Sequence, residues 1–270
     1  MRVFSPAAGG LLAVLYGVSA HAQAAPMTLS PIVELRQYTL HAGKRDVLID
    51  MFDAHFIEPQ ESAGINVIGQ FRNLDDPNKF VWLRGFPSMD VRARGLTEFY
   101  YGPVWKAFRN AANETIIDND NVLLLRPVHP ESSFLIERNE REAPGTRGDG
   151  KGLIVATIYH LDPTSEKQAD FVAFFEQKVV PLLTRAGAPV IASFVPETAA
   201  NNFPRLPVRE GEHVFVWFSH FHDAAAFDRS NAALAEMPQW RDSVAVELSA
   251  MVREPQTLRL KPTARSLLQY

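Results

Sequence analysis

The sequence predicts an α+β protein built from two tandem copies of one β-α-β-β-α-β unit, and two internal repeats indicate this. The triplet Phe-Val-Trp at residues 80–82 recurs at 215–217, and the Pro-x-Trp pattern at 103–105 recurs at 238–240 with the same offset. The chain has 270 residues, of which 46% are hydrophobic and 21% charged. That composition is typical of a globular protein with a sizeable core. A fixed repeat distance therefore predicts a duplicated unit.

The first copy contains both alternating and helical apolar patterns. β-Forming residues and apolar residues at helical spacing predict, in order, a strand at 32–40, a helix at 44–62, strands at 67–74 and 80–86, a helical stretch at 90–116 and a strand at 121–128. A turn-forming cluster, Asp75–Asn78, joins the two middle strands. Because proline lacks an amide proton, Gly102 and Pro103 predict a break in the second helix.

The second copy repeats this order with one difference in length. The expected elements are strands at 153–161, 190–196, 214–221 and 256–261, with helices at 165–185 and 224–251. One insertion, Glu197–Glu212, has no counterpart in the first copy. The predicted domains are a signal peptide at 1–22, a first domain at 31–128, a charged linker at 129–151 and a divergent second domain at 152–262.

A β-α-β-β-α-β order is typical of a ferredoxin-like unit, whose antiparallel sheet carries both helices on one face. The other face stays bare. Two such units in one chain can bury both bare faces against each other, which predicts an intramolecular pair related by a pseudo-twofold axis. The alternative is two separate domains, each of which needs a partner from another chain.

The first 22 residues have the pattern of a secretory signal peptide. Arg2 precedes an apolar stretch at 11–18, which is followed by Ala20-His21-Ala22. This predicts export, to the periplasm or outside the cell, with no membrane attachment after cleavage; a retained membrane anchor is the alternative. The chain has no cysteine, which excludes disulfides and thiol chemistry. Its net charge of -4 argues against nucleic acid as a partner.

The first copy resembles the NIPSNAP family, within the dimeric α/β barrel superfamily. The resemblance is carried by Glu34-Leu35-Arg36-Gln37-Tyr38, Gly69-Gln70-Phe71-Arg72, the run at 80–86, Gly102-Pro103-Val104-Trp105 and the run at 121–127. It implies an intramolecular pseudo-dimeric α/β barrel. It does not imply one activity, since the superfamily includes cofactor-independent monooxygenases, haem-degrading enzymes and polyketide cyclases. The second copy resembles the family less, and Ser219 stands where Arg84 stands in the first.

The candidate ligand-binding residues on the strands of the first copy are polar groups among aromatic ones. These candidates are Arg36, Tyr38, Gln70, Arg72, Trp82 and Arg84. Strand alternation places Glu34 on the same face of its strand as Arg36 and Tyr38. Buried charges are costly unless they are paired or face a wet cavity. One interpretation is a site for a planar carboxylate or enolate, bound by arginine and aromatic rings. The other is a structural charge pair between Glu34 and an arginine at the interface between the two sheets.

Further candidates lie on the predicted helices of the first copy. His55 lies on an apolar stripe, where it is either a core residue or a general base. Tyr101, Trp105 and Arg109 follow a spacing of four and are expected at the mouth of a pocket between helix and sheet. Packing is the alternative for Trp105, because a tryptophan recurs at 240 in the copy without the arginines.

The sequence contains no motif for a nucleotide or other cofactor, so we expect none. His220, His222 and Asp223 form a short cluster, but Asp223 is equally suited to cap a helix, and no metal is predicted. Neither second helix contains histidine, which argues against haem degradation.

Two functions therefore remain. One is binding of a small aromatic or carboxylate-bearing molecule in the first copy, with cofactor-independent catalysis as its extension. The other is a non-catalytic interaction or assembly module. Whether the chain forms a homo-oligomer is left open.

Overall fold

A computed structural model describes Met1 and residues 30–136, 141–161 and 166–270. The predicted signal peptide lies outside these residues. In the described part of the chain, eight antiparallel strands close into one barrel, in the order β1-β3-β2-β9-β6-β8-β7-β5 and back to β1. Their bounds are β1 Ile32–Leu40, β2 Asn66–Asn73, β3 Lys79–Phe86, β5 Val122–Pro127, β6 Leu153–His160, β7 Val190–Pro196, β8 Val214–Phe221 and β9 Gln256–Pro262. The short β4, Ile116–Asp118, pairs antiparallel with the end of β1.

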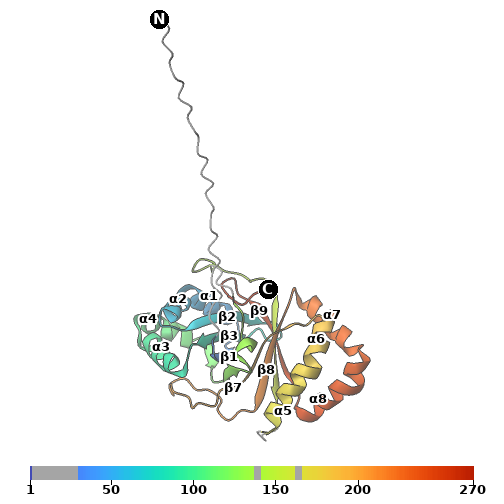
Figure 1. Ribbon diagram of the computed structural model, residues 1–270. Coiled ribbons are helices and arrows are strands. Elements are labelled where there is room, and N and C mark those ends of the chain that lie inside the picture. The colour runs from blue at the N-terminus through green and yellow to red at the C-terminus, as the bar shows by residue number, and fades with distance from the viewer. Residues whose placement is uncertain (2–29, 137–140, 162–165) are drawn as a thin grey trace.

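The helices lie outside the barrel in two groups, with α1–α4 on one side and α5–α8 on the other (Figure 1). The first group comprises α1 Arg45–His55, α2 Ile57–Ser62, α3 Met89–Tyr101 and α4 Pro103–Asn113. The second comprises α5 Glu166–Phe174, α6 Val180–Ala186, α7 Ala224–Ala235 and α8 Ala245–Met251, with π-helical turns at Phe175–Val179 and Trp240–Val244 and a 3-10 turn at Pro130–Ser132 between the halves. None of the described helices is both long and apolar enough to cross a membrane.

The predicted break in the second helix is confirmed at Gly102. This residue is extended, with φ −74° and ψ 168°, and Pro103 begins α4. Proline is suited to the first helical position because its missing amide proton would have no partner there. The break turns α4 back so that Trp105 lies against Tyr100, with ring centroids 4.9 Å apart.

The first half of the chain, with strands β1 to β5, and the second half, with strands β6 to β9, are joined along the edges of their sheets and not only through their faces. β5 pairs with β7, where Leu125 lies opposite Pro196, and β2 pairs with β9, where Phe71 lies opposite Pro262. An open sheet edge exposes unpaired amide and carbonyl groups. Each half supplies the partner for the other half's edges, so the bare faces become the interior of a closed barrel.

The barrel interior is apolar and receives side chains from both halves. Leu35, Leu83, Ile154 and Phe218 belong to this core. Because alternate residues of a strand point to opposite faces, the residues between them point outward, toward the helices. Arg36 and its neighbours therefore lie between the barrel wall and the first group of helices.

The C-terminal segment after β9 packs against the first half, a feature the sequence did not predict. The backbone amide of Leu268 donates to the carbonyl of Ile68 at 2.9 Å, and the amide of Gln70 donates to Oγ of Ser266 at 3.3 Å. Thr263 is buried as well. Residues 263–270 thus close one side of β2.

Gly95 marks a close approach between α3 and the end of α2. A Cβ atom at this position would lie 2.7 Å from the carbonyl oxygen of Ala63 and 3.0 Å from Ile65. We expect Gly95→Ala to lower the free energy of unfolding by about 1–3 kcal/mol, although alanine is the better helix former. Urea denaturation measures this. The exposed Glu98→Ala on the same helix is the control, and a stabilised Gly95→Ala variant would contradict the packing argument.

Candidate functional site

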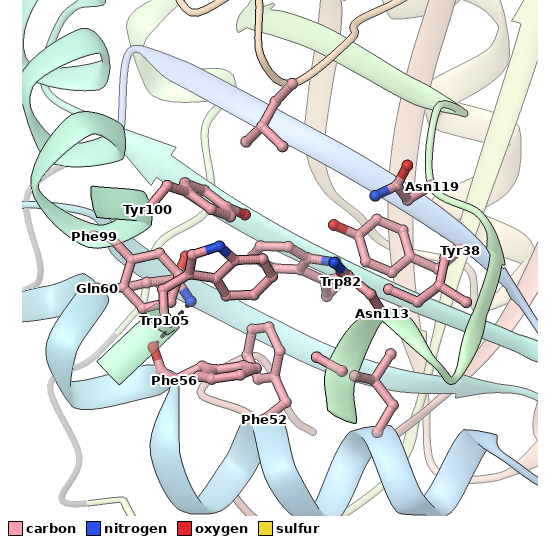
Figure 2. A pocket seen from close by; sticks show the side chains of 14 residues that line it. Tyr38, Phe52, Phe56, Gln60, Trp82, Phe99, Tyr100, Trp105, Asn113 and Asn119 are labelled. Atoms are coloured by element: carbon pink, nitrogen blue, oxygen red, sulfur yellow. Dashed lines mark hydrogen bonds between the residues drawn. The ribbon is translucent and has the colours of Figure 1, made fainter. Parts of the chain in front are cut away.

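A pocket with a cavity volume of about 50 Å³ lies between the barrel wall of the first half and the helices α1–α4 (Figure 2). Half of the residues that line it are aromatic, namely Tyr38, Phe52, Phe56, Trp82, Phe99, Tyr100 and Trp105. A pocket of mainly apolar lining with a few polar groups is typical of a small-molecule site.

The pairing of β1 with β3 sets the floor of the pocket. Glu34 lies opposite Arg84, and Arg36 lies opposite Trp82. Residues that lie opposite each other share one face of a sheet. The four side chains and Tyr38 therefore share one face, as the alternation of the sequence predicts, and in the structure this face is turned toward the helices.

Behind this floor, one buried carboxylate binds three arginines. Glu34 accepts hydrogen bonds from Nη1 of Arg36 at 2.5 Å, from Nε of Arg84 at 2.8 Å and from Nε of Arg92 at 2.7 Å. All four residues are 0% exposed. Burial alone would raise the pKa of Glu34, but the charges of Arg84, Arg36 and Arg92 outweigh it and hold this pKa well below its usual range. The structural charge pair considered from the sequence thus exists, but it faces the helices.

The cluster has more positive than negative charge. Three guanidinium groups share one carboxylate, and the Nη2 atoms of Arg36 and Arg92 have no hydrogen-bond partner among the described residues. The arginines' other hydrogen bonds go to uncharged groups; for example, Nη1 of Arg84 donates to Oε1 of Gln60 at 3.3 Å. Uncompensated buried charge creates a strong local potential. This potential favours an anionic or electron-rich group nearby.

Two tyrosines connect the charge cluster to the pocket. Nε of Arg36 donates to the hydroxyl oxygen of Tyr38 at 3.2 Å, and Cζ of Arg84 lies 5.9 Å from the ring centroid of Tyr100. The two hydroxyl groups point toward each other across the pocket (Figure 2). Burial raises the pKa of Tyr100, and the charge of Arg84 opposes this rise. Because the oxygen of Tyr38 already accepts from Arg36, its proton is available to a ligand.

The predicted strand residues are divided between the pocket and its surroundings. Tyr38 and Trp82 line the pocket. Arg36 and Arg84 lie directly behind it, with Cζ atoms 5.5 and 5.0 Å from the Trp82 ring. Gln70 is paired with Trp82 across β2 and β3 but is not part of the lining, and its buried side-chain amide has no hydrogen-bond partner among the described residues.

Arg72 is not brought to the pocket. Its guanidinium binds Asp46 of α1 at 2.8 Å and Asp149 at 3.0 Å. These contacts hold the segment between the halves against the barrel.

Of the predicted helix residues, Trp105 lines the pocket and the others do not. His55 is exposed and stacks on Phe108, with ring centroids 4.1 Å apart. Tyr101 is 54% exposed, and Arg109 is exposed on the outside of α4.

Several site residues were not predicted. Phe52, Phe56 and Gln60 follow each other at a spacing of four on α1 and α2, so a stripe on one helical face could have revealed them. Arg92 lies on a helix and not on the strands that suggested the cluster. Leu206 comes from the second half, and no local pattern marks it.

The corresponding region of the second half has no such cluster. Val155 stands in place of Glu34, and Ser219 in place of Arg84. Aromatic rings fill the space, with Phe175 4.6 Å from Phe215 and 5.7 Å from Trp217. Burial raises the pKa of the second half's tyrosine, Tyr159, to about 12. The charged pocket is thus a property of the first half.

The described residues contain no group of three metal-ligating side chains that could hold a metal ion. The histidine cluster considered above is a capping arrangement instead. Oδ1 of Asp223 accepts from the amide of Ala226 at 2.7 Å at the start of α7, and its Oδ2 lies 3.0 Å from His222.

Several solved structures are similar to this chain, including the following three. A candidate monooxygenase from Fusobacterium nucleatum, 10% identical, matches 87% of this chain and 94% of its own length with a TM-score of 0.54. An anthrone oxidase-like protein, 14% identical, matches 88% and 95% with a TM-score of 0.51. A NIPSNAP family protein from Agrobacterium tumefaciens, 26% identical, matches 36% of this chain and 92% of its own with a TM-score of 0.34.

The first two similarities extend over both halves and show a shared α+β barrel fold. Among curated proteins, none matches the sequence of this chain significantly. The NIPSNAP family model matches residues 33–130, which include β1 to β5, the charge cluster and most of the pocket. Residues 33–130, within the first half of this chain, therefore match a NIPSNAP domain.

Proposed function

We propose that the pocket of the first half binds a small planar aromatic molecule that carries a carboxylate or another anionic oxygen. The aromatic lining offers stacking and edge contacts to a ring, and ring pairs contribute about 0.5–1.5 kcal/mol beyond their buried area. The hydroxyl groups of Tyr38 and Tyr100 offer two donors to one oxygen atom. A ligand with an apolar ring and an anionic end matches both features.

The observation that carries this proposal is the excess of buried arginine over glutamate behind the two tyrosines. Burying three guanidinium groups with a single carboxylate is costly for stability alone, because each unpaired charge loses its hydration. An anion in the pocket would be attracted by Arg36 and Arg84 through the tyrosine hydroxyls. The same donors would stabilise an enolate or phenolate, so cofactor-independent turnover of an enolisable substrate is the catalytic form of this proposal.

The alternative is an interaction module in which these arginines serve assembly. Arg36 and Arg84 are 0% exposed and lie under the helices of their own half. Neither can contact a second chain without rearrangement. The burial of the cluster therefore favours the ligand-binding proposal.

We expect Tyr38→Phe to weaken binding of 2-naphthoate by about fivefold to tenfold, because one hydrogen bond to the anionic end is lost. Two of the chain's four tryptophans, Trp82 and Trp105, line the pocket, so tryptophan fluorescence can follow the titration. Tyr159→Phe is the matched control, since it removes the corresponding hydroxyl of the second half. If Tyr38→Phe and Tyr159→Phe weaken saturable binding equally, the ligand does not bind in the first half's pocket. If the wild-type protein binds no aromatic acid, the proposed function is wrong.

We also infer that the chain is a duplication of one ferredoxin-like unit. The strand orders β5-β1-β3-β2 and β9-β6-β8-β7 support this, since each has its last strand beside its first. The matched positions of Trp82 and Trp217 on β3 and β8 support it further. The domain limits 31–128 and 152–262 follow from this inference.

Export through a cleaved signal peptide is proposed on the sequence pattern of residues 1–22 alone. Intact mass measurement of the protein from the producing cell would test it, and a chain that keeps residue 1 would contradict it.

A further inference from the structure

We propose that the insertion at residues 197–212 of the second half forms one wall of the first half's pocket, and that Leu206 sets the size of ligand that the pocket accepts. This rests on the proposed function, because it assigns a specificity-determining residue to the same site. It also gives the second half a role in binding, although aromatic rings fill the region of the second half that corresponds to the pocket.

The ends of the insertion are attached to the first half. The amide of Glu197 donates to the carbonyl of Leu124 at 2.9 Å, and the amide of Arg209 donates to the carbonyl of Val122 at 2.8 Å. Both acceptors belong to β5 of the first half. The segment between them must therefore leave the second half and cross the first, where it runs beside α3 (Figure 1).

The middle of the insertion is held by the charge cluster. Nη1 of Arg92 donates to Oδ1 of Asn201 at 3.0 Å and to Oδ1 of Asn202 at 2.7 Å, while its Nε binds Glu34. The side-chain amide of Asn202 also donates to the backbone carbonyl of Met89 on α3 at 2.6 Å. One arginine therefore connects the buried carboxylate to the insertion.

The apolar side of the insertion faces the pocket. Leu206 is 8% exposed and lines the pocket beside residues of the first half. Phe203 packs on Tyr100, with ring centroids 6.0 Å apart. The shape of the turn is fixed internally, because the side-chain amide of Asn201 donates to the carbonyl of Leu206 at 2.9 Å.

These contacts make Leu206 a size limit rather than a source of chemistry. Every other lining residue belongs to the first half, within residues 38–116 and Asn119. Leu206 brings no polar group, so replacing it alters the space available and leaves Tyr38 and Tyr100 in place. A change of a few methylene groups in an apolar pocket alters selectivity about tenfold or more.

The test compares two probes, benzoate and the larger 9-anthroate, by calorimetric titration of the full chain. We expect Leu206→Ala to raise the affinity for 9-anthroate relative to benzoate by about tenfold, and Leu206→Trp to lower the same ratio. Val208→Ala is the matched control, since Val208 lies in the same insertion and packs against the same core without lining the pocket. Near-ultraviolet circular dichroism checks that each variant is folded.

Each outcome has one meaning. Opposite shifts of the ratio in the two Leu206 variants, with no shift in Val208→Ala, support the inference. Wild-type binding with an unchanged ratio in a folded Leu206→Trp variant overturns the inference and leaves the proposed function intact. A wild-type protein that binds neither probe overturns both.

Discussion

Replacing Glu34 by glutamine is expected to lower the free energy of unfolding by about 3–5 kcal/mol, which is the usual effect of removing one partner from a buried ion pair. The reason is specific to this cluster. Glu34 is the acceptor for Arg36, Arg84 and Arg92, and all of them are fully buried. Without the carboxylate, three guanidinium groups would repel one another in a medium of low polarity. Equilibrium denaturation in urea at neutral pH measures the effect.

The control for this variant is Glu247→Gln, which removes a carboxylate from an exposed pair with Lys178 at 2.7 Å. Exposed pairs contribute about 0–1 kcal/mol. If Glu34→Gln is destabilised no more than Glu247→Gln, the cluster is not an energetic unit. Because the pKa of Glu34 is depressed in the folded protein, its contribution is full above the unfolded pKa and is lost as pH falls toward the folded value.

Replacing Asp53 by asparagine is expected to have the opposite effect, a stabilisation of up to about 3 kcal/mol at pH 7. Asp53 is 3% exposed on α1, and burial raises its pKa from 3.8 to about 6 against the opposing effects of Thr263 and Arg265. Each unit of pKa shift corresponds to about 1.4 kcal/mol. Above about pH 6 this carboxylate is ionised in the folded protein although it is almost fully shielded from water, and this lowers the free energy of unfolding.

The sign of the pH dependence follows from the direction of this shift. The folded state binds the proton of Asp53 more tightly than the unfolded state does, so wild-type stability falls as pH rises from about 4 to 6 and then levels off. The difference between Asp53→Asn and wild type should therefore be small at pH 4.5 and large at pH 7.5, as measured by thermal unfolding at both values. The exposed Asp242→Asn is the control, and a pH-independent difference would contradict the argument.

The sequence predicts the parts of this protein that depend on local pattern and repetition. Gly102 and Pro103 predict the division between α3 and α4, which is confirmed. The recurring Phe-Val-Trp triplets predict a duplicated unit, which stays an inference. Alternation predicts that Glu34, Arg36 and Tyr38 share a face. These features depend on the fixed geometry of strands and helices, which neighbouring residues determine.

The rest depends on tertiary contacts for which no local pattern exists. Arg92 joins the cluster because α3 packs against β3, the neighbour of β1. Leu206 joins the pocket because an insertion crosses from one half to the other. Arg72 has the same strand pattern as the other arginines, but it finds Asp46 on α1 and is drawn away from the pocket. For a charged residue on a strand, the sequence thus predicts which face of the sheet its side chain lies on. Its ion-pair partner is known only from the tertiary structure.

The pairing of β2 with β9 also affects how the protein is made. Phe71 cannot find its partner until Pro262 has been synthesised, so the amino-terminal sheet keeps one edge open until then. Contacts between residues so distant in the chain slow folding, because the intervening loop must close first. Until β9 leaves the ribosome, that edge of the nascent polypeptide can pair with a strand of another chain.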